Sequence, residues 1–321
     1  MMAVAAEGLY KYYGTTRVVG RLDLAVPAGT TLGFLGPNGA GKTTTIGMLT
    51  TLLPPTAGRA TVAGYDVVAQ SAEVRNSIGV IFQESTLDME LTATENLRFQ
   101  AALCRLPRRQ ARAAISGMLE MLGLTDRAAT PVRNLSGGLR RRLEIARGLL
   151  HAPRVLFLDE PTTGLDAQTR AAVWDYLATL RREQAITIFF TTHQLEEAGH
   201  CDQIAIIDHG TIVAQGTPAE LKSLIGADLI TLRTEDDHAA ARLLSERFKL
   251  TAEEFPGGLR FRAANSSALV PLLCRELRVR VESVSVSAPT LDDVFLHHTG
   301  RAIRDERGDG RDLANLREDA R

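Results

Sequence analysis

Lysine is scarce in this sequence of 321 residues: it occurs only four times, so arginine supplies most of the positive charge. The formal net charge is −1, because 37 basic residues stand against 38 acidic ones. Domains dedicated to nucleic acids are usually strongly basic. The charge balance therefore argues against nucleic acid as a partner.

Cysteine is also rare, and long apolar runs are missing. The three cysteines, Cys104, Cys201 and Cys274, are scattered without the spacing of a metal site, as expected in a reducing cytosol. No apolar run approaches the ~18 residues of a membrane-spanning helix. Residues 1–9 contain Glu7 and lack the basic start of a signal peptide. We therefore expect neither a membrane span nor a signal peptide.

The most informative motif is at residues 36–43, where G-P-N-G-A-G-K-T fits the G-x-x-x-x-G-K-[ST] pattern of a phosphate-binding loop. Its context fits too. The apolar run at 31–35 predicts a buried strand before the loop, and a helix is expected to begin at Thr44. A strand, a glycine-rich loop and a helix in this order give the motif its chemistry.

The chemistry of phosphate binding explains the residue types in this loop. Backbone N–H groups near Gly39 and Gly41, together with the helix N-terminus, would surround phosphate oxygens. Lys42 would reach the β- and γ-phosphates, and the Thr43 hydroxyl would bind Mg²⁺. The sequence therefore predicts a nucleoside triphosphate site at Gly36, Pro37, Asn38, Gly39, Ala40, Gly41, Lys42, Thr43 and Thr44.

A second acidic motif lies at residues 155–160, where four apolar residues precede Asp159 and Glu160. A continuous apolar run is typical of a parallel strand buried on both faces. Such a strand would place both carboxylates at the carboxyl edge of the sheet, where ligands bind in open α/β folds. Asp159 suits the Mg²⁺ shell, and Glu160 suits a general base that polarises the attacking water.

The segment Leu135-Ser136-Gly137-Gly138 resembles the signature of ATP-binding cassette (ABC) ATPases. Ser136 is a suitable N-cap for the helix that follows, and the two glycines leave backbone amides open to an anion. The resemblance implies ATP as the ligand and a homodimer packed head to tail, in which Ser136, Gly137 and Gly138 of one subunit contact the γ-phosphate held by the other. Leu139 stands where the family most often has Gln, which leaves the expected phosphate contacts unchanged.

Further matches follow in the order of this family. By resemblance, Tyr13 would stack on the adenine, Gln83 would join Mg²⁺ and water to the transmembrane partner, and Asp166 would contact the opposite cassette. His193 would bond the γ-phosphate and hold Glu160 in place. The resemblance thus assigns catalysis to Lys42, Gln83, Glu160 and His193, and metal binding to Thr43, Gln83 and Asp159.

The pattern along the chain predicts an α/β fold, with a P-loop NTPase (RecA-like) core, an antiparallel β subdomain and a helical subdomain at about 87–150. We assign residues 1–225 to this nucleotide-binding domain. A βαββαβ order predicts a small α+β ferredoxin-like domain at 226–300, with a regulatory or assembly role. Residues 301–321 have few apolar side chains and are expected to be a disordered tail.

The carboxyl-terminal motif at 289–296 resembles that of the daunorubicin-resistance ATPases. It also predicts an amphipathic helix, with Leu291, Val294 and Phe295 as an apolar face for a second subunit or a permease. Asp292 and Asp293 are expected to be exposed.

The resemblance implies the ATPase subunit of an exporter, peripheral on the cytoplasmic face of the cell membrane. It would drive efflux of an amphipathic drug or antibiotic through a separate permease. Other transported substrates (lipid, polysaccharide or an imported compound) stay open, as does a role in drug binding or sensing. A cassette used in DNA maintenance would need a long coiled coil, and there is no sustained heptad pattern here.

Overall fold

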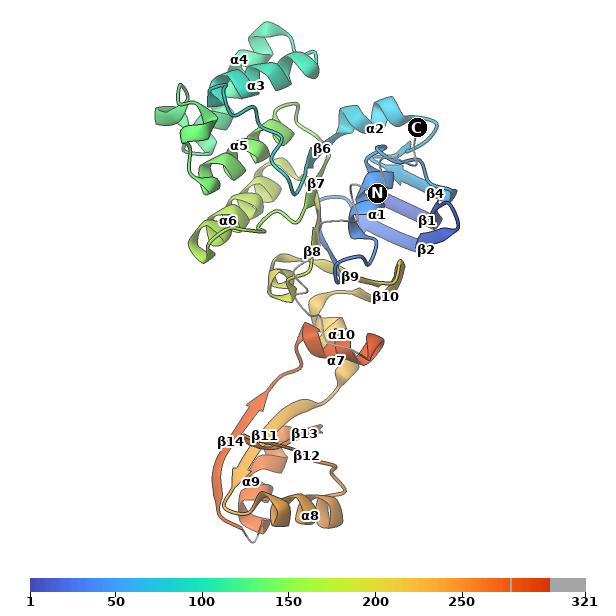
Figure 1. The fold of residues 1–321 in the computed structure, drawn as a ribbon, viewed down its shortest axis with the longest axis vertical. Helices are drawn as coiled ribbons and strands as arrows, with labels where there is room; N and C mark the ends of the chain where they lie inside the picture. Colours follow the sequence, from blue (N-terminus) through green and yellow to red (C-terminus); the bar gives the residue numbers. More distant parts are fainter. Residues whose placement is uncertain (278, 301–321) are drawn as a thin grey trace. The chain divides into compact units, whose positions relative to one another are not determined.

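The structure, a computed structural model, describes residues 1–277 and 279–300. They form two compact units, one covering Met1–Thr217 and one beginning at Pro218 (Figure 1). The predicted disordered tail at 301–321 lies outside the described residues. No helix in the described ranges combines the length and the apolar character that crossing a bilayer requires.

An antiparallel sheet begins the first unit. Its strands are β1 (Met2–Tyr13), β2 (Thr16–Pro27), β4 (Ala57–Val62) and β5 (Tyr65–Asp66), in the order β2-β1-β4-β5. Val4, Ala6 and Leu9 of β1 are buried, because one face of this sheet packs on the core, and the register shifts between Ala6 and Leu9. A turn at Gly14 joins β1 to β2.

The main sheet has the order β10-β9-β3-β8-β7-β6. Its strands are β3 (Thr31–Leu35), β6 (Ile78–Ile81), β7 (Val155–Asp159), β8 (Thr187–Thr192), β9 (Gln203–Asp208) and β10 (Thr211–Gly216). All neighbours run parallel except β10, which forms a hairpin with β9. Every residue of β3, β7 and β8 is buried, as continuous apolar runs in a parallel sheet require.

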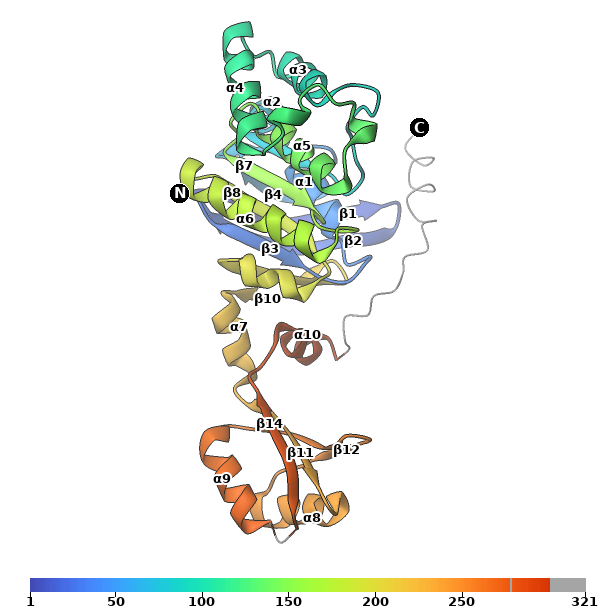
Figure 2. The same cartoon turned by 90° about the vertical axis from the view of Figure 1, so that its left-hand side faces the viewer.

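Helices and the antiparallel sheet cover the two faces of the main sheet. One face packs with β1, β2 and β4 and with the helices α1 (Lys42–Leu49) and α2 (Ser71–Ser77), around Phe34, Phe157 and Phe189. The other face packs against α6 (Ala167–Gln184), which lies across β7 and β8 (Figure 2). There Trp174 meets Phe190 edge-on, with ring centroids 4.6 Å apart.

A helical segment lies between β6 and β7 in the chain. It contains α3 (Ala93–Leu103), α4 (Arg108–Met121), two short 3₁₀ turns at Thr125–Arg127 and Val132–Asn134, and α5 (Gly137–Leu149). Thr92 and Glu95 form a capping box that fixes the start of α3. The segment has a core of its own, formed by residues such as Leu97, Leu119 and Leu143.

The second unit contains the expected βαββαβ order, in β11 (Asp228–Thr234), α8 (Asp237–Phe248), β12 (Glu253–Phe255), β13 (Gly258–Ala263), α9 (Ser266–Glu276) and β14 (Val281–Ser287). The sheet order is β12-β13-β11-β14, antiparallel throughout. The unit also holds α7 (Pro218–Ile225) and α10 (Leu291–Thr299), which pack against each other. The boundary expected at residue 226 thus falls after α7, whereas the compact unit begins before it.

The closing helix α10 corrects two expectations. Leu291, Val294 and Phe295 are buried, on a helix that packs against α7, so this face is not free for a partner. Asp293 is not an exposed carboxylate either, because it forms a capping box with Thr290 and an ion pair with Arg262 of β13. Asp292 is exposed as expected. These contacts make Asp293 a structural residue.

Gly79 of β6 tests how closely α5 packs on the main sheet. A Cβ atom at this position would lie 2.3 Å from the carbonyl oxygen of Gly148 in α5. We therefore expect Gly79→Ala to lower the free energy of unfolding by about 1–3 kcal/mol, as overpacking does. Urea titration of the purified chain measures the change.

The matched control is Gly117→Ala in α4, where a Cβ atom would meet nothing within 4 Å. This change should raise stability by up to ~1 kcal/mol, because alanine favours the helix. Equal effects of the two substitutions would contradict the packing assigned to Gly79.

Candidate functional site

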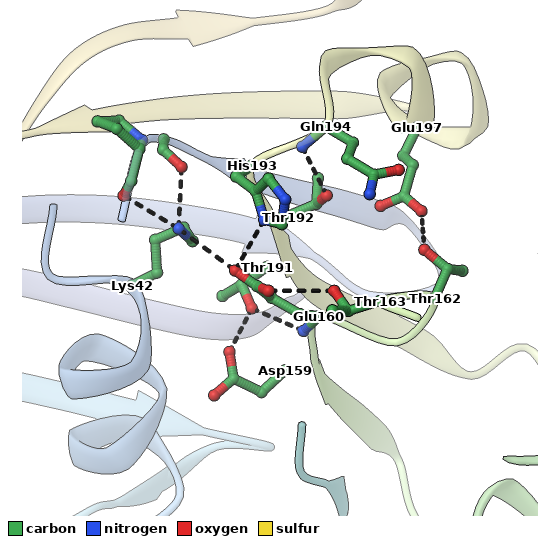
Figure 3. A network of polar contacts seen from close by, with 12 residues as sticks. Lys42, Asp159, Glu160, Thr162, Thr163, Thr191, Thr192, His193, Gln194 and Glu197 are labelled. Atoms are coloured by element: carbon green, nitrogen blue, oxygen red, sulfur yellow. Dashed lines mark hydrogen bonds and ion pairs between the residues drawn. The ribbon is translucent and has the colours of Figure 1, made fainter. Parts of the chain in front are cut away.

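The predicted site residues follow three neighbouring parallel strands. The phosphate loop follows β3, Asp159 ends β7 with Glu160 next, and His193 follows β8. The pairing places Asp159 opposite Thr191 and Leu35 opposite Thr192. Because parallel strands share their carboxyl edge, Lys42, Asp159, Glu160 and His193 come together in one network (Figure 3).

The phosphate loop is held by its surroundings on both sides. The N–H of Gly36 donates to the carbonyl of Thr192 at 3.2 Å, and the N–H of Gly210 donates to the carbonyl of Ala40 at 2.9 Å. Gly41 precedes α1 with φ 103°, and a Cβ atom there would lie 3.0 Å from the carbonyl oxygen of Val18. Only glycine combines this conformation with this close approach.

The exposed part of this loop is open to an anion. Asn38 and Gly39 are exposed, and a Cβ atom at Gly39 would meet nothing within 4 Å. Thr43 is exposed and Thr44 half-buried at the start of α1. Amides of the loop and of the first turn of α1 therefore lie where a phosphate group can accept from them.

Lys42 is 5% exposed and points back over the loop. Its Nζ donates to the carbonyls of Gly36 at 2.9 Å and Pro37 at 3.0 Å, and lies 3.6 Å from Glu160 Oε1. Burial lowers the pKa of Lys42, although the charges of Glu160 and Asp159 oppose this shift. The ammonium is thus held at the point where the loop meets the carboxylates.

Glu160 is buried, and hydrogen bonds fix both its carboxylate and its backbone N–H. Its Oε1 lies 3.1 Å from His193 Nδ1, its Oε2 accepts from the Thr163 hydroxyl at 3.1 Å, and its N–H donates to Thr191. Its backbone is left-handed, with φ 46°, which costs energy for a side chain with a Cβ atom and often occurs at functional sites. Burial raises the pKa of Glu160, but the hydrogen bond with His193 and the charge of Lys42 outweigh it, so the pKa is lowered.

Asp159 lies beside Glu160 and is bonded by the Thr191 hydroxyl. Burial raises its pKa above the usual value, although the hydroxyls of Thr191 and Thr43 and the charge of Lys42 act in the opposite direction. Within the described ranges, no group of three His, Cys, Asp or Glu side chains could enclose a metal ion. A hydroxyl and one carboxylate at an open loop fit Mg²⁺, which binds to one or two protein oxygens together with substrate phosphates.

Gln83 and Tyr13 lie at the edges of this arrangement. Gln83 follows Phe82 after the end of β6 and is exposed. Tyr13 ends β1, half-buried, and Lys11 Nζ lies 5.1 Å from the centre of its ring. No described contact joins either side chain to Lys42 or Glu160.

The signature residues form a separate surface. The Ser136 hydroxyl accepts from the N–H of Leu139 at 3.4 Å, so Ser136 caps α5 as expected. Ser136 and Gly137 are exposed. A Cβ atom at Gly138 would lie 2.6 Å from Thr169, whose N–H and hydroxyl bond to the exposed Asp166. The signature and Asp166 are thus joined through Thr169, and no described contact links them to the phosphate loop.

Three residues with a clear role in this geometry were missed in the sequence. Thr191 bonds both Asp159 and the N–H of Glu160, Thr163 bonds Glu160, and Gly210 anchors the phosphate loop. Thr191 could have been found, because threonine is unusual at the end of a buried apolar strand. Thr163 lies only three residues after Glu160, and its bond is a local one within the loop that follows β7. The bond from Gly210 to Ala40 joins distant segments, so neither partner's own segment indicates it.

The lowered pKa of Glu160 makes its contribution to stability depend on pH. Since the folded pKa lies below the ordinary 4.5, the charged carboxylate stabilises the fold above that pH, and this stabilisation is lost as pH falls through the folded pKa. The stability difference between wild type and Glu160→Gln should therefore be largest near neutral pH and shrink below about pH 4.5.

Urea unfolding of both proteins across this range measures the difference. A stability difference that stays constant with pH would contradict the ionised, bonded state assigned to Glu160.

Comparisons with known proteins agree with this geometry. Residues 19–163 match the family described as ABC transporter, and residues 216–299 match the family of the carboxyl-terminal domain of DrrA1-3-like ATP-binding proteins. The chain is 42% identical over 305 residues to the daunorubicin resistance ATP-binding protein DrrA3 of Streptomyces coeruleorubidus, covering 93% of this chain and 96% of that protein.

A second relative is named for a different exported compound. The chain is 39% identical to the Nod factor export ATP-binding protein I of Ralstonia nicotianae, covering 94% of this chain and 95% of that protein. A solved structure, the dimeric ATP-binding cassette MJ0796 in a post-hydrolysis state bound to ADP and Pi, is 25% identical with a TM-score of 0.60. That match covers 67% of this chain and 98% of the other.

The expected P-loop NTPase fold is confirmed by this solved structure and by the family match. The expected family is confirmed by relatives that match over nearly the whole chain. The chain is an ATPase that belongs to the ATP-binding subunits of ABC transporters, in the group of DrrA-like proteins.

Proposed function

We propose that this chain hydrolyses ATP to drive export of an amphipathic drug or antibiotic. The observation that carries the hydrolytic part is the convergence of Lys42, Glu160 and His193 at the carboxyl edge of the main sheet. The cargo rests on similarity to a daunorubicin resistance protein, since a fold and its ATPase chemistry do not name a substrate.

The phosphate loop and its neighbours fit MgATP. Backbone N–H groups of Asn38, Gly39 and Gly41, together with that of Thr44, would surround the phosphates, while the N–H groups of Gly36 and Ala40 stay bonded to Thr192 and Pro37. Lys42 would exchange its loop carbonyls for β- and γ-oxygens. The hydroxyl of Thr43, the carboxylate of Asp159 and the amide of Gln83 would hold Mg²⁺. When bound, this ion neutralises charge that develops on the phosphates. Tyr13 stacks on the adenine.

Glu160 acts as the general base. Its lowered pKa keeps the carboxylate ionised at neutral pH, so it can accept a proton from the water that attacks the γ-phosphorus. His193, bonded to Oε1 of Glu160, fixes the direction of the carboxylate and contacts the γ-phosphate. Gln83 positions the same water.

Two copies of the chain complete each other's sites. Ser136 and Gly137 are exposed and make no described contact with their own phosphate loop, which suits contacts made to a second subunit. Gly138 and Asp166, joined through Thr169, belong to the same surface. The similar cassette MJ0796 is a dimer, so we propose a head-to-tail homodimer with two MgATP at its interface.

Transport itself requires a separate permease in the membrane, with this subunit peripheral on the cytoplasmic face. We assign residues 226–300 to assembly or regulation of that complex, because they form a separate α+β core that takes no part in the nucleotide site. A different exported compound is the second candidate, since a Nod factor export protein is nearly as similar as the drug-resistance protein. Drug-stimulated ATPase activity with the reconstituted permease separates the two.

The Glu160→Gln variant tests the base. The amide keeps the size of the side chain but cannot accept the proton, so hydrolysis should fall by about 10²–10⁴-fold. MgATP binding should stay within about threefold, because the phosphate loop is unchanged. Single-turnover hydrolysis and equilibrium nucleotide binding measure the two effects, and gel filtration should show an ATP-bound dimer. Turnover within threefold of wild type would remove Glu160 from this role.

Mixing two inactive variants tests the composite sites. Ser136→Arg places a bulky cation where the partner's γ-phosphate should lie, and Lys42→Ala loses the phosphate contact. In a mixed head-to-tail dimer, one site receives wild-type Lys42 and wild-type Ser136 from different subunits. An equal mixture should therefore recover about a quarter of wild-type activity if subunits exchange and sites act independently.

The matched control mixes Ser136→Arg with the double variant Lys42→Ala/Ser136→Arg, which leaves no site with both wild-type residues. This mixture should stay inactive. Equal activities of the two mixtures would contradict sites shared between subunits.

A further inference from the structure

Arg141 is a buried charge on α5, one and a half turns after Ser136. It is 7% exposed, and Glu144, one turn further along the helix, is 5% exposed. Nη1 of Arg141 lies 2.6 Å from Oε2 of Glu144. Burying a charge costs free energy unless the charge is paired and its remaining hydrogen-bonding groups also find partners. The other contacts of Arg141 therefore show which part of the fold this pair supports.

The other hydrogen bonds of Arg141 all go to backbone carbonyls on the sheet side of α5. Nη1 donates to Phe82 at 2.9 Å, and Nε donates to Pro161 at 2.7 Å. Nη2 lies 3.5 Å from the carbonyl oxygen of Glu160. Phe82 immediately precedes Gln83, and Pro161 immediately follows Glu160. One guanidinium therefore joins the two chain segments that carry these side chains.

The neighbouring Arg140 makes bonds of the same type with a different destination. Its Nε and Nη2 donate to the carbonyls of Val132 and Arg133, at 3.1 Å and 2.7 Å. Both acceptors belong to the helical segment. The two adjacent arginines therefore have different roles. Arg140 bonds α5 to the helical segment, and Arg141 bonds α5 to the carboxyl edge of the main sheet.

We propose that Arg141, oriented by Glu144, is a positioning residue for hydrolysis. It fixes the distance between the segment of Gln83 and the left-handed backbone of Glu160, so that both side chains meet the same water. This role rests on the function proposed above for Glu160. A lysine could not replace it, because an ammonium is a point charge that cannot bond three separate carbonyls in the plane of a fork.

The test is Arg141→Lys. This change leaves Glu144 with a positive partner and removes only the guanidinium group that bonds the three carbonyls. The rate of single-turnover hydrolysis at saturating MgATP should fall by about 10–100-fold, because misplacing a catalytic group by ~1 Å costs about 10². The Kd for ATP should stay within about threefold, since no described hydrogen bond joins Arg141 to the phosphate loop.

Arg140→Lys is the matched control and should keep the hydrolysis rate within about threefold. If Arg141→Lys fails to fold, the neutral pair Arg141→Gln/Glu144→Gln takes its place, since it removes both buried charges together. Equal rates for the Arg140 and Arg141 variants would overturn the proposal. A loss of rate that comes with an equal loss of ATP affinity would overturn it too.

A double variant shows whether Arg141 acts through Glu160. Added to Glu160→Gln, Arg141→Lys should lower the rate by less than about threefold further, because residues that act as one unit are not additive. An independent, full loss would overturn the positioning role. Near wild-type turnover of Glu160→Gln alone would instead overturn the function proposed for Glu160, so the two failures are distinguishable.

Discussion

The parallel pairing of β3, β8 and β7 is the constraint on which the rest of the site depends. It places Leu35 beside Thr192 and Asp159 beside Thr191, so the loop, the carboxylates and the histidine leave the sheet at one level. A slip of one residue in any strand would turn its side chains to the opposite face. Close packing of the side chains on both faces of these strands opposes that slip.

Several features at this edge of the sheet are unfavourable for folding. It buries Lys42, Asp159 and Glu160, and it keeps Glu160 in a left-handed conformation. The charges offset one another in part: Lys42 favours the ionised forms of both carboxylates, while burial opposes every one of these charges. Threonine hydroxyls supply much of the remaining compensation, from Thr163 and Thr191. The surrounding fold therefore maintains the geometry of this site, since isolated segments could not keep the buried charges and the left-handed backbone in place.

The sequence was sufficient to predict those features that residues close together in the chain determine. The phosphate loop, the strand ending at Asp159, the Ser136 cap and the βαββαβ order each have a short-range signal, and the structure places them as expected. Contacts between distant segments could not be derived in this way. The bonds from Arg141 to Phe82 and Pro161 and the ion pair of Asp293 with Arg262 have no signature within either partner's own segment. The catalytic, metal-binding and dimer roles of the named residues stay predictions.

The hairpin between β9 and β10 has a consequence for how the chain is made. Its Gly210 amide holds the Ala40 carbonyl of the phosphate loop, and β3 finds its neighbours only in β8 and β9. During synthesis, the loop therefore leaves the ribosome long before any of these partners exist. It stays without its supporting strands until the last part of the first unit has emerged. Competence to bind nucleotide should thus appear abruptly and late in translation, and truncation before Gly210 would leave the most recognisable motif of the sequence without its anchor.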